Sequence, residues 1–305
     1  MYERFYGLRE RPFDLTPNPR YLLLTSKHRE ALSNLEYGIS ARKGITVLTG
    51  EAGTGKTTLI RAAFVRADTE CKGAADSWAY LKNPRLERSE FLELLAARFG
   101  VSTHPGQSPA RSFGELERAL AQNRRAALFV DEAQTVPTDM LEEIRLLGNI
   151  ESDVEKLLPI VLVGQPELAD RLNDPCLRQL KQRVALRCTL SPLSLQETGA
   201  YIAARIEIAG GNPGRLFSRD AVVAIYEYAS GIPRTISVIC DNALLTGYAE
   251  DRCPVDVDLI EAVCRDFDLH RRRSGHSAAG PMNPATNDPP YSSRRTDDLI
   301  AQSRR

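Results

Sequence analysis

The nine residues Gly50–Thr58, GEAGTGKTT, constrain the fold of this 305-residue chain more than any other feature. They follow the apolar run Ile45–Thr49, precede a helix-forming stretch and match G-x-x-x-x-G-K-[ST] at every fixed position. Glycines let the backbone curl around a phosphate and present its N–H groups, and the dipole of the following helix attracts the same anion. The pattern therefore predicts a strand, a phosphate-binding loop and a helix, which together indicate an α/β fold.

Two side chains of this loop carry specific expectations. Lys56 is expected to reach the β- and γ-phosphates of a nucleotide, and Thr57 to place its hydroxyl on Mg²⁺. A chance glycine-rich turn is the competing interpretation, and the strand–loop–helix context argues against it. The expected nucleotide-binding residues are Gly50, Glu51, Ala52, Gly53, Thr54, Gly55, Lys56, Thr57 and Thr58.

A second motif, AALFVDEAQ at residues 126–134, ends an apolar run in two carboxylates. Asp131 is expected to hold Mg²⁺ through its water shell, because a carboxylate at a strand end suits this hard cation. Glu132 is expected to polarise an attacking water as general base. Acidic residues often follow buried strands, so the motif gains its meaning from the phosphate loop earlier in the chain. The pair of motifs indicates hydrolysis of the nucleotide and not storage alone.

Continuous apolar runs, typical of buried parallel strands, alternate with helical stretches over the first two thirds of the chain. The expected strands are Ile45–Thr49, Ala127–Val130, Ile160–Val163 and Val184–Leu190, with a weaker one at Ser77–Lys82. The expected helices are Lys56–Arg66, Ser89–Phe99, Phe113–Arg124, Thr138–Gly148 and Pro166–Leu172. This alternation predicts a parallel sheet with helices on both faces, whose carboxyl edge binds the ligand.

After residue 192 the pattern changes to helices alone. Ser194 and Glu197 fit a capping box that opens a helix to about Ala209, and Ser218 fits the cap of the next one. From Arg271 onward Pro, Ser, Gly and Arg prevail, which predicts a disordered tail. The arginine excess of the tail favours either an acidic surface or simple solvation.

Composition limits the classes of function. Forty basic residues balance forty acidic ones, so the chain lacks the basic excess typical of nucleic-acid binding. Its six cysteines form no C-x-x-C and its four histidines no H-E-x-x-H, which argues against a metal site of those types. Unpaired thiols, the lack of a secretory leader and the lack of a membrane-length apolar stretch favour the cytoplasm.

In chain order, the motifs GEAGTGKTT, FVDEAQ, VGQPEL, LRQLKQRV and GIPR resemble those of AAA+ ATPases. The segment FYGLRERPFDLTPNPRYLLLTSKHREALSNLEYGI extends the resemblance to the family of general secretion pathway protein A and its relatives at exopolysaccharide and exosortase loci. The resemblance covers about residues 1–268. It implies an N-terminal family-specific segment (1–25), an AAA+ α/β nucleotide-binding domain (26–192), a small all-helical lid domain (193–270) and the tail (271–305).

The resemblance also implies roles for several further side chains. Gln165 takes the place of a polar residue that touches the γ-phosphate or the attacking water, where Asn or Thr is more usual. Arg183 is expected to enter the neighbouring subunit's site as an arginine finger, with Arg178 as the alternative. Arg234, in a Gly-x-Pro-Arg opening of a lid helix, resembles the sensor-2 arginine that reaches the γ-phosphate.

The family therefore implies a cytoplasmic, Mg²⁺-dependent ATPase that forms a homo-oligomer with a shared active site. Its hydrolysis would drive assembly or remodelling of a cell-envelope secretion or polysaccharide-export machinery through an inner-membrane partner. Family members often continue into a membrane helix and a peptidoglycan-binding module, and this sequence shows neither. The alternatives are an ATP-gated DNA-associated regulator, such as a transposition accessory ATPase, and a scaffold that binds nucleotide with little hydrolysis.

Overall fold

A computed structural model describes residues 1–16, 18–70, 78–82, 87–101, 109–122, 126–152 and 155–271. The chain divides into two compact units. Thr25–Ser191 forms an α/β unit, whereas Met1–Leu24 joins the residues from Pro192 onward in a helical unit. Nothing in the sequence predicted that the N-terminal segment belongs to the same unit as the C-terminal helices.

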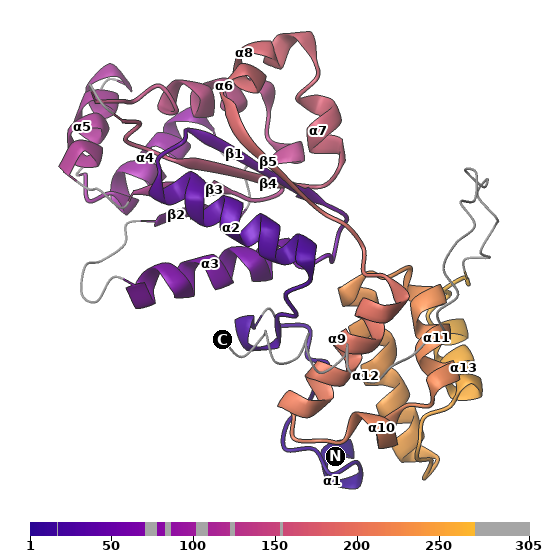
Figure 1. Ribbon diagram of the computed structural model, residues 1–305. Coiled ribbons are helices and arrows are strands. Elements are labelled where there is room, and N and C mark those ends of the chain that lie inside the picture. The colour runs from indigo at the N-terminus through magenta and orange to yellow at the C-terminus, as the bar shows by residue number, and fades with distance from the viewer. Residues whose placement is uncertain are drawn as a thin grey trace, which may run out of the picture. The chain divides into compact units, whose positions relative to one another are not determined.

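The α/β unit contains one sheet of five parallel strands in the order β2-β3-β4-β1-β5 (Figure 1). The strands are β1 (Ile45–Gly50), β2 (Trp78–Leu81), β3 (Ala127–Val130), β4 (Ile160–Gly164) and β5 (Val184–Leu190). Each lies within one residue of an apolar run picked out in the sequence, so the prediction of a parallel α/β sheet is confirmed. Because all strands run in one direction, the ends of β1, β3 and β4 meet at one edge of the sheet.

Helices cover both faces of this sheet (Figure 1). Their bounds are α2 (Ser26–Ser40), α3 (Lys56–Glu70), α4 (Arg88–Arg98), α5 (Pro109–Gln122), α6 (Thr138–Leu147), α7 (Glu167–Arg171) and α8 (Arg178–Gln182). Short 3₁₀ helices, η2 (Ala133–Thr135) and η3 (Pro175–Leu177), complete the unit. Helix α5 begins four residues before the predicted position.

The alternation of side chains along each strand explains why helices pack on both faces of the sheet, because successive side chains of a strand point to opposite faces. Ile45 and Val47 of β1 lie in one large buried cluster with side chains of α4, α5 and α6. Leu48, on the opposite face of β1, is equally buried but lies outside that cluster. Both faces of the central strands are therefore covered, as continuous apolar runs indicate.

The helical unit has a separate core. The described helices of this unit are α1 (Tyr2–Phe5), the 3₁₀ helix η1 (Pro19–Tyr21), α9 (Leu195–Ile208), α10 (Pro213–Leu216), α11 (Arg219–Ala229), α12 (Pro233–Ala249) and α13 (Val257–Asp266). Ser194 and Glu197 make the predicted capping box at the start of α9, and Ser218 caps α11. In the described part of the chain no helix is long and apolar enough to cross a membrane.

The helical unit continues through Arg271, which the sequence assigned to the tail. The Arg271 guanidinium pairs with Glu227 at 2.5 Å and with Glu261 at 3.3 Å. Arg271 is therefore held by α11 and α13. The rest of the predicted disordered tail, residues 272–305, lies outside the described residues.

Candidate functional site

The phosphate-loop motif forms the connection between β1 and α3. Gly53 and Gly55 have φ angles of +82° and +98°, a region that side chains rarely adopt, so the loop needs glycine at both positions. Thr54 is buried and closes the loop by donating its hydroxyl and its N–H to the carbonyl of Glu51, at 2.8 and 3.2 Å. The loop is thus held in its curled form by its own residues.

Lys56, the first residue of α3, is buried in the centre of this loop. Its Nζ donates to the carbonyl oxygens of Gly50 and Glu51, at 2.7 and 3.0 Å. Burial lowers the pKa of Lys56 from its ordinary value, while the negative charges of Glu132 and Asp131 oppose that shift. The ammonium group therefore sits among loop carbonyls and near two carboxylates, where an anionic ligand would find a cation already in place.

Asp131 follows β3 and is buried. Its Oδ2 accepts a hydrogen bond from the hydroxyl of Thr57, 3.3 Å away, and its Oδ1 accepts one from the N–H of Glu132 at 3.0 Å. The Tyr80 hydroxyl, from the neighbouring strand β2, also donates to Oδ2. Burial, and next the hydrogen bond to Asp131, raise the pKa of Tyr80 well above its usual range, which keeps this group protonated as a donor.

Glu132 has a left-handed backbone conformation, with φ of +51° and ψ of +38°. For a non-glycine residue this is an uncommon conformation, of the kind that is concentrated at functional sites. Its Oε2 accepts from the amide of Gln134 at 2.6 Å and from that of Gln165 at 3.4 Å. The carboxylate is therefore oriented by two amides at the carboxyl ends of β3 and β4.

Gln134 also connects these two strand ends. Its Oε1 accepts from the backbone N–H of Gln165 at 3.1 Å, and its carbonyl accepts from Arg171 at 2.9 Å. A Cβ atom on Gly164 would approach the Gln134 Oε1 to 2.6 Å and the Leu168 Cδ2 to 2.9 Å, so a larger residue there would displace these side chains. The position of Gln134 is thus fixed from β4 and α7.

His28 contacts the phosphate loop from α2. Its Nε2 lies 3.3 Å from the carbonyl oxygen of Thr54, and its Nδ1 lies 2.8 Å from the hydroxyl of Thr25. A carbonyl only accepts, so the Nε2 donates its proton in the contact with Thr54. This buried histidine supports the backbone of the loop.

The structure brings together five predicted site residues, namely Lys56, Thr57, Asp131, Glu132 and Gln165, at the carboxyl edge of the sheet. Arg178 and Arg183 lie at the two ends of α8 and are exposed. Arg234 is exposed in the first turn of α12 in the helical unit. The roles expected of these three arginines remain predictions.

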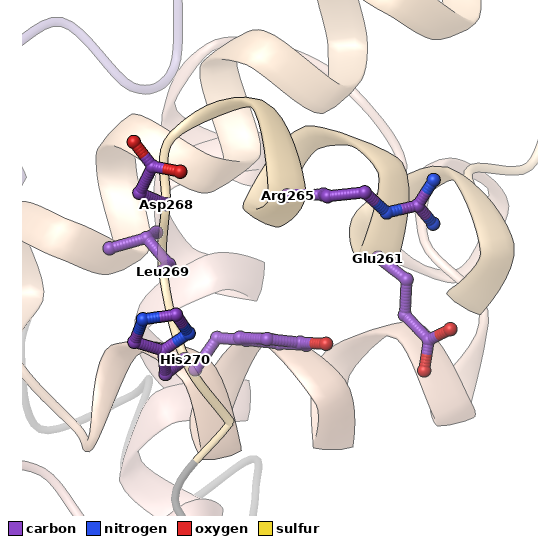
Figure 2. A pocket seen from close by; sticks show the side chains of 6 residues that line it. Glu261, Arg265, Asp268, Leu269 and His270 are labelled. Atoms are coloured by element: carbon purple, nitrogen blue, oxygen red, sulfur yellow. The ribbon is translucent and has the colours of Figure 1, made fainter.

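A pocket in the helical unit lies elsewhere and contains none of the predicted site residues (Figure 2). It is lined by Tyr228, Glu261, Arg265, Asp268, Leu269 and His270. The candidate site of the α/β unit is instead built around a loop and three strand ends.

Sequence reasoning missed Tyr80, Gln134 and His28. Gln134 belongs to the motif FVDEAQ, two residues after Glu132, so the sequence could have predicted that the two side chains lie close together. Tyr80 lies in the weakest predicted strand, and its contact depends on β2 pairing with β3. His28 reaches Thr54 across 26 residues of sequence, a contact that no local pattern marks.

The residues present fit a magnesium–nucleotide complex. Thr57 and Asp131, the two expected metal-site groups, share a hydrogen bond, and oxygen ligands of this type suit Mg²⁺. The loop amides and the buried Lys56 suit phosphate oxygens. The hydroxyl of Thr57 and the ammonium of Lys56 come from consecutive residues at the start of α3.

Comparisons with known proteins match the chain to a AAA domain and to two sequence relatives. A protein-family model described as a AAA domain matches residues 39–172. The chain is 40% identical over 253 residues to general secretion pathway protein A of Aeromonas hydrophila, which covers 82% of this chain and 45% of that protein. It is 30% identical over 153 residues to Mu-like prophage FluMu DNA transposition protein B of Haemophilus influenzae, covering 49% of this chain and 47% of the relative.

Among solved structures, the Aeropyrum pernix ORC2 protein matches with a TM-score of 0.63 and 19% identity, covering 84% of this chain and 71% of that one. At this identity the match supports the fold alone. The chain spans less than half the length of each of the two sequence relatives.

Proposed function

Because the chain belongs to the AAA-type P-loop ATPases and is related to general secretion pathway protein A, we propose that it is a Mg²⁺-dependent ATPase. Its hydrolysis of ATP would drive assembly or remodelling of a cell-envelope secretion or polysaccharide-export machinery. The observation that carries the proposal is the meeting of a buried lysine, a hydroxyl and two consecutive carboxylates at the phosphate loop.

Each of these groups has a task that its geometry supports. Lys56 exchanges its two loop carbonyls for phosphate oxygens of the nucleotide, which its buried position favours. Thr57 and Asp131 would hold Mg²⁺, which would supply positive charge to neutralise the phosphates. Glu132 orients the attacking water and accepts its proton, because its carboxylate is exposed at the site and steadied on Oε2.

Gln165 is proposed to act beside Glu132. Its amide lies 3.4 Å from the Glu132 Oε2, close enough to orient the carboxylate or a bound water on the same side. In this role the longer glutamine side chain serves where Asn or Thr is more usual.

We also propose a homo-oligomer in which Arg183, or Arg178 in its place, completes the active site of a neighbouring subunit. Both guanidinium groups are exposed at the ends of α8, where a second subunit is able to meet them. Arginine fingers raise phosphoryl-transfer rates by about 10³–10⁵-fold, so isolated subunits should hydrolyse slowly. Arg234 is proposed to contact the γ-phosphate from the helical unit.

Dilution tests the shared site. ATP turnover per subunit, measured over a protein concentration range that spans dissociation, should fall steeply as the oligomer separates. Arg183→Ala should remove most of this dependence, and Arg178→Ala serves as its matched comparison on the same helix. Constant turnover per subunit down to monomeric protein would contradict the proposal.

The proposed cellular role is tested with protein that binds ATP but hydrolyses it slowly. Immobilised Glu132→Gln protein with ATP should retain an inner-membrane protein of a secretion or export system from detergent-solubilised envelopes. Lys56→Met, which should not bind ATP, is the control. Equal retention by both variants would contradict an ATP-dependent envelope partner.

A second candidate function is an ATP-gated DNA-associated regulator. The 30% identity to a DNA transposition protein over half of the chain favours it, while the balanced net charge does not. DNA binding that requires ATP, weakens with salt and survives removal of residues 272–305 would support this candidate. If the protein retains an envelope partner but shows no such DNA binding under the same conditions, the first proposal is favoured.

A further inference from the structure

Tyr80 approaches the candidate metal site from the strand beside it. It pairs in register with Phe129 of β3, so Tyr80 and Asp131, two residues beyond Phe129, face the same side of the sheet. From there the Tyr80 hydroxyl reaches Asp131 Oδ2. The contact therefore follows from strand pairing and alternation, and not from a flexible side chain that happens to swing near.

The ring of Tyr80 is itself held in place. It packs with Phe64 of α3 and Phe129 of β3, at centroid distances of 6.3 and 6.4 Å. Trp78, two residues earlier on β2, packs on the same two phenylalanines at 3.9 and 5.4 Å. The hydroxyl at the end of this anchored ring thus has a defined position relative to Asp131.

Asp131 receives donors from three directions. Thr57 donates to Oδ2 from α3, Tyr80 donates to the same oxygen from β2, and the N–H of Glu132 donates to Oδ1. In its hydrogen bond with Asp131 the Tyr80 hydroxyl is the donor. Tyr80 and Thr57 act on one oxygen, so Tyr80 does not draw Asp131 away from Thr57.

We propose that Tyr80 is a positioning residue of the magnesium site: it holds the Asp131 carboxylate against Thr57 before the metal–nucleotide complex binds. This inference rests on the proposed function, since it assigns Asp131 and Thr57 to Mg²⁺. A purely packing role would need no hydroxyl, because the neighbouring Phe64 and Phe129 fill the same cluster without one. Partners that orient a metal-site carboxylate typically change metal affinity by 10–100-fold when removed.

The test is binding of a non-hydrolysable ATP analogue by calorimetry, with excess Mg²⁺ and with EDTA, in the parent and in Tyr80→Phe. The substitution removes one oxygen and keeps the ring. Tyr80→Phe should leave the Kd in EDTA unchanged and reduce the tightening by Mg²⁺ about tenfold. Thermal unfolding without ligand should show that Tyr80→Phe is folded.

The chain offers a matched control in its other unit. Tyr2 of α1 donates its hydroxyl to Asp241 of α12, so Tyr2→Phe removes the same kind of hydrogen bond within the helical unit. Tyr2→Phe should keep the full Mg²⁺ effect, as should Trp78→Phe, which alters the aromatic cluster but not the hydroxyl.

Three results would overturn the inference. They are an unchanged or stronger Mg²⁺ effect in Tyr80→Phe, an equal loss of affinity in Mg²⁺ and in EDTA, and an equal loss in Trp78→Phe. If the parent binds the analogue without any Mg²⁺ effect, the proposed magnesium site itself is wrong and the inference falls with it.

Discussion

Lys56 in the α/β unit and Arg205 in the helical unit are both buried cations that donate to backbone carbonyls, and their surroundings differ. In the α/β unit, the Lys56 ammonium donates to two carbonyls of a glycine-rich loop. In the helical unit, the Arg205 guanidinium donates to the carbonyls of Pro12 and Asp14 and to the Tyr201 hydroxyl. Neither cation pairs with a carboxylate among the described residues at ion-pair distance.

The difference lies in what surrounds each cation. Arg205 also lies against the rings of Tyr21, Tyr201 and Phe13, 4.7 to 5.9 Å from their centroids. The guanidinium group of Arg205 donates to groups of the chain itself, so Arg205 connects the N-terminal segment to α9. Lys56 ends in a single ammonium group that has two carbonyl partners and negative charge nearby. Arg205 is thus held by its own chain on several sides, whereas Lys56 makes two hydrogen bonds within a phosphate loop, where phosphate oxygens would replace them.

Replacing Lys56 should have the largest effect on function. Lys56→Met should lower ATP turnover by at least about 10²–10³-fold, because a fixed cation at the phosphates is lost. The unfolding temperature without nucleotide should fall less than in Arg205→Met, because Lys56 donates two hydrogen bonds, whereas Arg205 donates three and packs on three aromatic rings. Turnover and calorimetric ATP binding near parent levels would remove the distinction between the two cations.

Replacing Arg205 should instead affect stability. Arg205→Met should cost about 3 kcal/mol of unfolding free energy, because buried carbonyls lose charged donors. The N-terminal segment should then become more susceptible to trypsin at Arg9 and Arg20. ATP affinity measured below the unfolding transition should be that of the parent. A loss of affinity as large as in Lys56→Met would show that Arg205 also serves the ligand site.

Cysteine labelling should show the smallest effect, a difference between the two units in how far nucleotide protects their buried thiols. Cys188 is buried in the α/β unit, and Cys240 and Cys264 are buried in the helical unit. Burial raises the pKa of all three thiols, that of Cys264 to about 12. Near pH 8 they should therefore label far more slowly than the exposed Cys176 and Cys253. MgATP analogue should slow labelling of Cys188 more than that of Cys240 or Cys264. Equal protection of all three would indicate that the nucleotide stabilises both units alike.

Much of the fold follows from local patterns in the sequence. The apolar runs, the phosphate loop and the capping box at Ser194 and Glu197 each depend on residues close together in the chain, and the structure contains all of them. The grouping of Met1–Leu24 with the C-terminal helices was not predictable in this way. It depends on contacts such as that of Arg205 with Pro12, which are 193 residues apart.

The same limit applies to the site. Motif spacing identified Lys56 and the two carboxylates, because each stands at the end of a strand or the start of a helix. Tyr80 and His28 reach the site through strand pairing and helix packing, which single-sequence patterns do not encode. The residues that hold the reactive groups in place were therefore harder to predict than the reactive groups themselves.

Glu132→Gln tests most directly whether this loop and carboxylate pair form a hydrolytic site. ATP turnover and ATP affinity are measured side by side for the parent, Glu132→Gln and the control Glu30→Gln, an exposed carboxylate of α2 paired with Lys27. Glu132→Gln should bind ATP as tightly as the parent and hydrolyse it about 10²–10⁴-fold more slowly, with Glu30→Gln unchanged. Turnover by Glu132→Gln at the parent rate would contradict the account.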